Sequence, residues 1–214
     1  MRAGSTILQE ERPIRVSPAS SVRQRIIRDA RRHFFANGFR GVTMDDLASE
    51  LGMSKKTLYS HFSSKTALLE AVLMDKFRDA GADLERTTAA ASSDFLMSLH
   101  GLLACLQRQM GEIQPPFVRD MRREAPDMFK LVETRRAEMI QRHFGKLLGR
   151  GRRAGVIRKD IPVNLIIETL LGAVQAIVNP LKMEELGMMP RDGLLTVIKI
   201  ILEGAIARKG RKEA

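Results

Sequence analysis

Cysteine and the larger aromatic residues are scarce in this 214-residue chain, which has one cysteine, Cys105, one tyrosine and no tryptophan. A single cysteine excludes an internal disulfide and cannot by itself supply a structural zinc site. Long hydrophobic runs are also missing. The longest charge-free stretches, such as residues 169–181, have 13 residues, whereas a membrane-spanning helix needs about 20. Because no apolar signal-peptide region follows the first methionine, we expect a cytoplasmic protein that is neither secreted nor inserted in a membrane.

Acidic residues are outnumbered, since 36 Lys and Arg residues face 25 Asp and Glu residues and give a formal net charge of +11. Residues 1–66 hold 12 basic and 6 acidic residues, so the positive excess is densest near the start of the chain. Such an excess favours a polyanionic partner, either nucleic acid or an anionic membrane surface. We expect the polyanion to bind the N-terminal segment.

Strand signals are absent, because pairs such as Val156-Ile157 are too short to form a strand. Val22, Ile26, Ala30 and Phe34 recur every four residues, which is typical of the buried face of a helix. Similar periodicity, interrupted at glycines and prolines, continues along the chain and predicts an all-α fold. The helices are expected at 21–37, 43–52, 55–62, from about 65 past Phe77, and at 94–110, 116–124, 127–153, 163–178 and 191–208. Small polar residues at 87–93 predict a junction between two halves.

The segment 43–62 predicts a pair of short helices joined by a tight turn. Thr43 is a good N-cap for the first, Gly52 ends it, and Ser54 caps the second. Leu58 and Phe62 form the inward side of the second helix. Two short helices joined by a glycine-containing turn form a helix-turn-helix, whose second helix enters the DNA major groove.

The outward side of the second short helix carries groups suited to DNA. At about 100° per residue, Lys56 and Ser60 point directly away from Leu58. Lysine and serine side chains hydrogen-bond base edges. The hydroxyls of Thr57 and Tyr59, on the flanks, are placed to hydrogen-bond phosphate oxygens. A short solvated helix that happens to carry two lysines would show the same pattern, so this observation alone leaves both interpretations open.

Residues 22–69 resemble the N-terminal domain of TetR-family transcriptional regulators. The matching residues are Ile26, Ile27, Ala30, Phe34, Gly38, Phe39, Thr43, Met44, Leu47, Ala48, the run from Leu51 to Phe62, Lys65, Leu68 and Leu69. The resemblance implies that the operator is faced by Lys55, Lys56, Thr57, Tyr59, Ser60 and His61. It implies that Thr43 and Lys65 hold phosphates. Lys56 departs from the family, which usually has glycine, alanine or proline there, so the operator sequence is not transferable from relatives.

The resemblance implies a three-helix DNA-binding domain at 21–66, between a flexible basic arm at 1–20 and a helical effector-binding and dimerisation domain at 67–208. Residues 209–214 would form a basic tail. The implied function is that of a homodimeric regulator, in the first instance a repressor, which leaves a pseudo-palindromic operator when a small hydrophobic effector binds. The alternative is a helical protein that binds a ligand or partner and does not act on DNA.

Two C-terminal segments are apolar on nearly every side, and this predicts an interface. Residues 163–178 and 194–206 contain few polar residues, and a helix that is apolar all round must be covered all round. We expect a two-fold four-helix interface formed by helices 163–178 and 191–208 of two chains. The alternative is that both helices are core helices of a monomer.

The middle of the chain is expected to enclose an adaptable apolar cavity, because the chain has 12 methionines and 9 phenylalanines. Polar residues that would orient a ligand include His143, Glu168, His100 and Gln107. The candidate ligand-binding residues are Phe95, Leu99, Leu103, Phe117, Met121, Met139, His143, Phe144 and Glu168.

Enzymatic chemistry is not indicated. The sequence shows no Ser/His/Asp or Cys/His constellation, no metal-ligand cluster and no phosphate-binding loop. Gly149 and Gly151 formally match a dinucleotide fingerprint, but no strand precedes them. We therefore expect no catalytic residue, metal or cofactor. Binding of the basic helices to a membrane surface is a further alternative.

Overall fold

A computed structural model describes residues 18–89 and 94–205, and its regular elements are α-helices. Within these residues they are α1 (Pro18–Asn37), α2 (Met44–Glu50), α3 (Lys55–His61), α4 (Lys65–Ala89), α5 (Phe95–Gly111), α6 (Pro115–Glu124), α7 (Pro126–Arg153), α8 (Val163–Ile177), α9 (Pro180–Glu185) and α10 (Pro190–Ala205). The expected all-α class is confirmed. Of the expected arm at 1–20, residues 18–20 belong to α1 instead. The rest of the arm and the tail at 209–214 lie outside the described residues.

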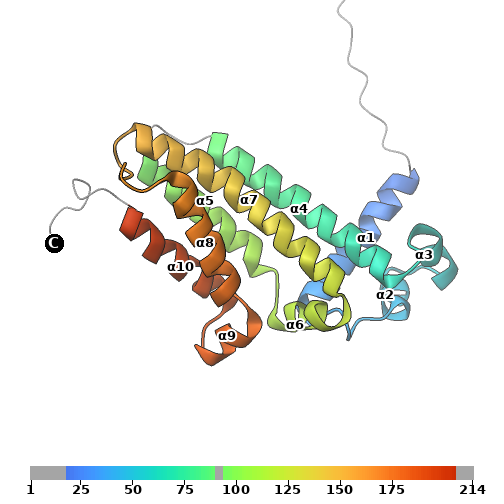
Figure 1. The fold of residues 1–214 in the computed structure, drawn as a ribbon. Helices are drawn as coiled ribbons and strands as arrows, with labels where there is room; N and C mark the ends of the chain where they lie inside the picture. The colour runs from blue at the N-terminus through green and yellow to red at the C-terminus, as the bar shows by residue number, and fades with distance from the viewer. Residues whose placement is uncertain (1–17, 90–93, 206–214) are drawn as a thin grey trace, which may run out of the picture.

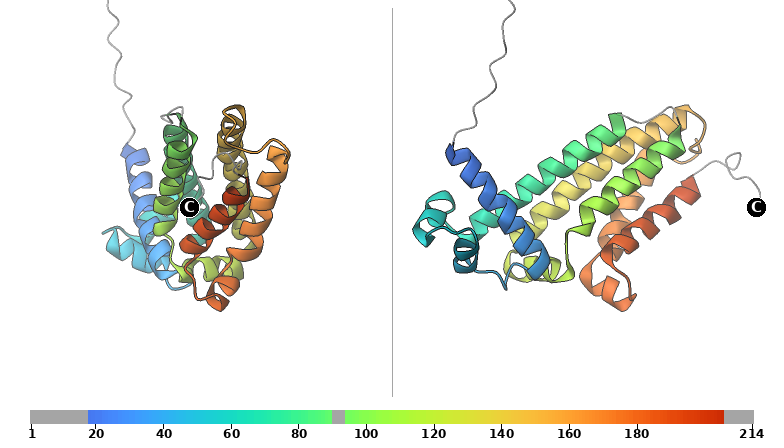
Figure 2. Two further views of the ribbon diagram at one scale, coloured as in Figure 1. Left: turned by 90° about the vertical axis from the view of Figure 1, so that its left-hand side faces the viewer. Right: turned by 180° about the vertical axis from the view of Figure 1, so that it is seen from behind.

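The helices form an elongated molecule with α1, α2 and α3 at one end (Figure 1). Helices α4, α5 and α7 run side by side along its length, and α8 and α10 pack on the same bundle. Figure 2 shows α3 and the C-terminal end of α10 at opposite ends of the molecule. The candidate DNA-binding surface and the expected interface helices are therefore well separated.

The first hydrophobic core lies among α1, α2, α3 and the beginning of α4. Phe34 of α1, Leu47 of α2 and Leu58 of α3 are fully buried there. Phe117 of α6 belongs to the same core and contacts Phe35 with ring centroids 4.7 Å apart. We call α1, α2, α3, the beginning of α4 and α6, which share this core, the N-terminal unit; its packing extends beyond residue 66.

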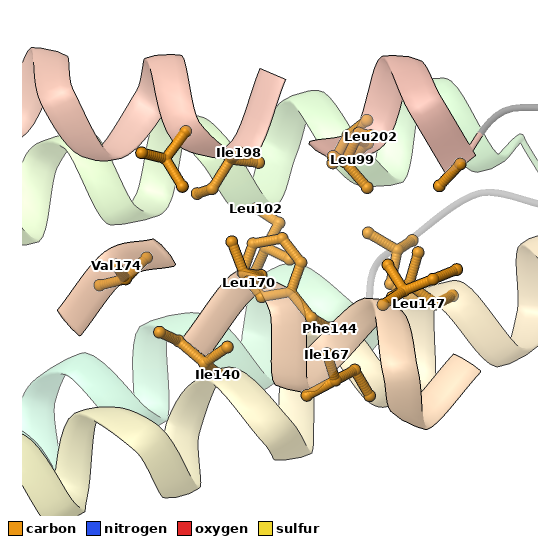
Figure 3. Packing of buried hydrophobic residues seen from close by; sticks show 14 of the residues in the cluster. Leu99, Leu102, Ile140, Phe144, Leu147, Ile167, Leu170, Val174, Ile198 and Leu202 are labelled. Atoms are coloured by element: carbon orange, nitrogen blue, oxygen red, sulfur yellow. The ribbon is translucent and has the colours of Figure 1, made fainter. Parts of the chain in front are cut away.

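The second core fills the space between α4, α5, α7, α8 and α10 (Figure 3). Leu102, Phe144 and Leu170 meet at its centre, and Ile198 and Leu202 of α10 cover one side. These side chains come from segments that the sequence periodicity had marked as apolar. This burial stabilises the long helices, because in proteins most helical stability comes from the packing of an apolar face against other elements.

Two elements differ from the sequence-based expectation. Helix α4 continues to Ala89, through the small polar residues that predicted a junction, and the hydroxyls of Thr87 and Thr88 donate to carbonyl oxygens one turn earlier, at 2.8 Å each. Helix α9 was not expected at all. It begins at Pro180, and the Asn179 side chain caps it by accepting the Lys182 N–H at 3.0 Å.

Candidate nucleic-acid interface and interior cavity

The turn between α2 and α3 has the geometry of a helix-turn-helix. Gly52 adopts a φ of 62°, in the left-handed region that glycine favours, and its N–H donates to the Ser49 carbonyl at 3.1 Å. The Met53 N–H donates to the Ala48 carbonyl at 2.9 Å. Ser54 then caps α3 by accepting the Thr57 N–H at 3.1 Å. The caps and turn that the sequence predicted are present.

Helix α3 faces the way its sequence predicted. Leu58 and Phe62 are buried, with exposed fractions of 0% and 3%, whereas Lys56 and Ser60 are exposed. Tyr59 is 48% exposed on the flank. The helix therefore seats its apolar side on the first core and presents its polar side to solvent at the end of the molecule (Figure 1).

The hydroxyl groups of α3 already make hydrogen bonds within the helix. Thr57 Oγ1 lies 2.9 Å from Ser54 Oγ, and Ser60 Oγ donates to the Thr57 carbonyl at 2.7 Å. A hydroxyl that donates in this way retains its lone pairs, which can accept from a base amino group. In this arrangement Ser60 is suited to accept a hydrogen bond.

The two lysines of α3 differ in their partners. Lys55 forms an ion pair with Asp45 of α2. In the part of the chain that the structure describes, no carboxylate forms an ion pair with Lys56. The Lys56 ammonium is therefore the readier donor toward an incoming duplex. His61, at the end of α3, is half-buried.

Thr43 and Lys65, the two expected phosphate contacts, are held by other residues of the chain. The Thr43 hydroxyl accepts the Asp46 N–H at 3.1 Å and the Thr43 N–H donates to Asp46 Oδ2 at 2.9 Å, which forms a capping box. The hydroxyl also donates to Asp46 Oδ2 at 2.6 Å, and these hydrogen bonds to Thr43 lower the pKa of Asp46. The Lys65 ammonium lies 4.4 Å from the centre of the Phe39 ring, and its burial lowers its pKa. Each would have to exchange a protein contact for a phosphate contact.

Arginines of α1 adjoin this surface, although their sequence pattern predicted no role for them in DNA binding. The Arg23 guanidinium lies 4.5 Å from the centre of the Phe62 ring. Arg25 donates to the Leu51 carbonyl at 3.2 Å. Both side chains are exposed. Both arginines lie on the polar face of α1, opposite its buried apolar residues, and this sequence pattern could have identified them as candidate DNA contacts.

A cavity of about 360 Å³ lies in the bundle, between the two cores. Five of the expected ligand-binding residues line it, namely Phe117, Met121, Met139, His143 and Phe144. The rest of the apolar lining comes mainly from α4, α5, α8 and α10 and includes Phe77, Leu84, Leu102, Leu106, Leu170 and Ile198. The volume falls within the range of small-molecule sites, about 300–1,000 Å³.

Four expected ligand-binding residues lie away from this cavity. Phe95 packs closely on Gly151, so that a Cβ added at Gly151 would lie 2.6 Å from the Phe95 ring. Leu99 is in the second core and Leu103 packs against it, while Glu168 is exposed on α8. Helix α5 turns a different stripe toward the cavity, formed by Leu102, Leu106, Gln109 and Met110. His100 and Gln107, also considered as polar candidates, are exposed.

Further polar residues at the cavity, which the sequence did not predict, come in charge pairs. Lys76 is 6% exposed and its ammonium donates to Gln109 Oε1 at 2.8 Å. The same ammonium forms an ion pair with Glu112 Oε1 at 3.1 Å. Burial lowers the pKa of Lys76. Arg136 donates to Glu133 at 2.6 Å. Sequence pattern could not identify these residues, because charged residues on helices are usually solvated.

The cavity wall and the N-terminal unit are directly connected. Asp120 of α6 accepts the Arg40 N–H at 2.9 Å, just beyond the end of α1. The Gln114 N–H donates to the Phe35 carbonyl at 3.0 Å, and Phe35 itself lines the cavity. Arg31 of α1 reaches Glu112 at 2.7 Å and Asp79 of α4 at 2.8 Å. A movement of the cavity wall would therefore act directly on α1, against which α3 is packed through the first core.

A helix-turn-helix unit mounted on a larger helical bundle defines the class of helix-turn-helix DNA-binding regulators. A family model described as "Bacterial regulatory proteins, tetR family" matches residues 26–72, which span α2, α3 and parts of α1 and α4. Together with the relatives described below, this match supports a TetR-family transcriptional regulator, and the matched residues are those of its N-terminal DNA-binding part.

Similarity to known proteins extends over most of the chain. The HTH-type transcriptional regulator SrpR of Pseudomonas putida is 26% identical over 190 residues, which cover 86% of this chain and 83% of SrpR. The HTH-type transcriptional repressor DhaR of Mycobacterium sp. (strain GP1) is 24% identical over 180 residues, 83% of this chain and 90% of DhaR. The solved structure of a SmeT–triclosan complex shares the fold, with a TM-score of 0.64 and 17% identity over 88% of this chain and 93% of that one.

No helix in the described ranges 18–89 and 94–205 has the length and apolarity needed to cross a bilayer. Over the same ranges, no group of three or more His, Cys, Asp or Glu side chains is arranged to hold a metal ion.

Proposed function

We propose that this regulator is a homodimeric repressor that reads a pseudo-palindromic operator with α3 and leaves it when a small, mainly apolar effector occupies the cavity. The observation that carries the DNA-binding part is the orientation of α3, with Leu58 buried and Lys56 and Ser60 exposed. The repressor role is supported by the similarity to DhaR, which is named a repressor.

In this proposal the outward residues of α3 contact different parts of the DNA. Lys56 and Ser60 contact base edges in the major groove, because they lie opposite the buried side of the helix. Contacts to the flanking bases and phosphates come from Lys55, Thr57, Tyr59, His61, Thr43 and Lys65. Arg23 and Arg25 join this set, since both are exposed beside α3.

The proposed dimer interface consists of the outward faces of α8 and α10, which pack against each other within one chain. Each helix buries one side in the second core and exposes large apolar side chains on the other. Leu165 is 55% exposed and Ile200 is 65% exposed. A Cβ added at Gly172 or Gly204 would meet no atom within 4 Å, so both glycines leave room for a partner backbone. Exposed apolar faces of this kind mark interaction sites.

The proposed effector site is the cavity, and α6 is the proposed link to DNA binding. Phe117 and Met121 line the cavity and also belong to the first core. A ligand that displaces α6 would disturb the Asp120 contact to Arg40 and thereby the seating of α1. Coupling between two such sites is typically 1–3 kcal/mol, or about 5–150-fold in affinity. The triclosan complex of SmeT supports the idea that this fold accommodates small apolar molecules.

Selection of bound fragments from random duplex DNA tests the DNA-binding part of the proposal. We expect an enriched sequence with two related half-sites about 34–36 Å apart, bound by a dimer in sedimentation velocity. Affinity for that duplex should fall steeply as salt concentration rises, because released counterions drive phosphate binding. Failure to enrich any sequence would favour the alternative of a helical ligand- or partner-binding protein.

A further inference from the structure

His143 stands out among the residues that line the cavity. It lies on α7 and is 3% exposed, and its Nδ1 atom is buried without a hydrogen-bond partner among the described residues. Buried polar atoms are nearly always hydrogen-bonded, because an unpaired one forfeits its hydration without compensation.

The imidazole is expected to be uncharged when it lacks a ligand. Burial lowers the pKa of His143, and the neighbouring Arg142 and Lys146 lower it further, while Glu85 of α4 opposes them. A neutral imidazole has one nitrogen that donates and one that accepts. A hydroxyl group can do either, so it can satisfy Nδ1 in both tautomers.

The cationic residues of the lining are already neutralised. Lys76 pairs with Glu112 and Arg136 pairs with Glu133. The third cation, Arg191, lies 3.2 Å from a carboxylate oxygen of the adjacent Asp192. A charged ligand would lose its hydration and find no free counter-charge among these groups, which is unfavourable. The lining thus favours an uncharged ligand.

We propose that the effector is an uncharged, largely apolar molecule whose hydroxyl group hydrogen-bonds His143 Nδ1. This inference rests on the proposed effector cavity and specifies the chemical class that the cavity takes. The apolar body packs against side chains such as Leu102, Phe144 and Ile198, and the single hydroxyl fixes its orientation at α7. The volume of about 360 Å³ accommodates a body of two aromatic rings.

Three probes that share a biphenyl body test this assignment at pH 7: 4-phenylphenol, biphenyl and biphenyl-4-carboxylate. Their dissociation constants are measured by fluorescence titration of the full-length protein without DNA, where the absence of tryptophan keeps the background low. We expect 4-phenylphenol to bind about 10-fold more tightly than biphenyl, as one satisfied hydrogen bond to a buried group implies. The carboxylate should bind most weakly.

Two variants test whether the difference in affinity between 4-phenylphenol and biphenyl depends on His143. His143→Phe keeps an aromatic ring but removes both nitrogens, so the preference for 4-phenylphenol should shrink to within about 2-fold. His143→Asn keeps a polar atom near the position of Nδ1 and should retain most of the preference. Circular dichroism melting of both variants establishes that they are folded under the titration conditions.

The possible outcomes separate this inference from the proposed function. Equal affinity of the wild-type protein for 4-phenylphenol and biphenyl, a preference that persists in His143→Phe, or tightest binding of the carboxylate would each overturn the hydroxyl assignment while leaving an apolar effector cavity in place. Absence of binding by all three probes would instead contradict the effector cavity, and the hydroxyl assignment with it.

Discussion

On α3, the residues differ in what they must give up to contact DNA. The Ser60 hydroxyl already donates within the helix and Lys55 is paired with Asp45, whereas Lys56 has no ion-pair partner in the described structure. The Tyr59 side chain is half-exposed beside it. Because breaking an existing contact offsets part of the gain from a new one, Lys56 and Tyr59 are expected to contribute most to operator affinity.

The first prediction concerns this pair. The double variant Lys56→Ala/Tyr59→Phe should raise the dissociation constant for the selected operator by about 100-fold or more, since each good base or phosphate contact is worth ~1–3 kcal/mol. Fluorescence anisotropy of a labelled duplex measures this change. Lys159→Ala, at an exposed lysine in the turn before α8, is the matched control and should leave affinity within about 2-fold. Unchanged operator affinity in the double variant would refute the assigned reading surface.

Two glycines with positive φ provide a second prediction. Gly38 has a φ of 87° and a Cβ there would come within 2.5 Å of Asp120 Oδ2, whereas Gly52 has a φ of 62° and open space around it. Gly38→Ala should therefore lower the free energy of unfolding by more than about 2 kcal/mol, and Gly52→Ala by about 1 kcal/mol. Urea denaturation of the two variants checks the order. A larger loss at Gly52 would show that the contact with Asp120 is easily relieved.

At the scale of the element, α6 connects the two halves of the molecule. It is a short helix that opens with two prolines, and its buried residues are Phe117, Asp120 and Met121. Phe117 and Met121 line the cavity, whereas Asp120 accepts the Arg40 N–H just after α1. The sequence predicted the helix itself from its prolines and periodicity. That Asp120 is buried and accepts the Arg40 N–H follows only from the packing of α6 on α1.

Removal of the Asp120 contact gives the third prediction. Asp120→Ala leaves the Arg40 N–H without its acceptor, so the free energy of unfolding should fall by ~1–3 kcal/mol, and operator affinity should fall because α1 is less firmly seated. Asp120→Asn keeps an acceptor oxygen and should lose clearly less. Urea denaturation and operator titration measure the two effects. Equal behaviour of the two variants would exclude the hydrogen bond as the cause.

At the scale of the whole molecule, the proposed function calls for a second copy of the chain. Helices α8 and α10 lie far along the bundle from α3 (Figure 1), so a dimer through their outer faces would leave both α3 helices exposed. The fourth prediction compares two side chains of equal exposure, Ile200 on α10 and Met97 on α5, each 65% exposed. Ile200→Arg should yield monomers in sedimentation velocity, because it buries a charge in the interface, whereas Met97→Arg should leave the dimer intact.

Loss of the dimer in both variants, or in neither, would contradict an interface on α8 and α10. Ile200→Arg should also weaken operator binding, since a monomer contacts one half-site only. Its helix content should be unchanged, because Ile200 is exposed and does not belong to the buried second core.

The sequence by itself determined most of the helices and the orientation of α3, because helical periodicity and capping residues act locally. Leu58 and Phe62 are four residues apart and must share a face, whatever surrounds them. The tertiary structure alone decided which residues line the cavity. Leu103 and Leu106 are both apolar residues of α5, yet only Leu106 borders the cavity. Periodicity fixes the faces of one helix relative to its own axis, whereas a cavity depends on how several helices pack around it.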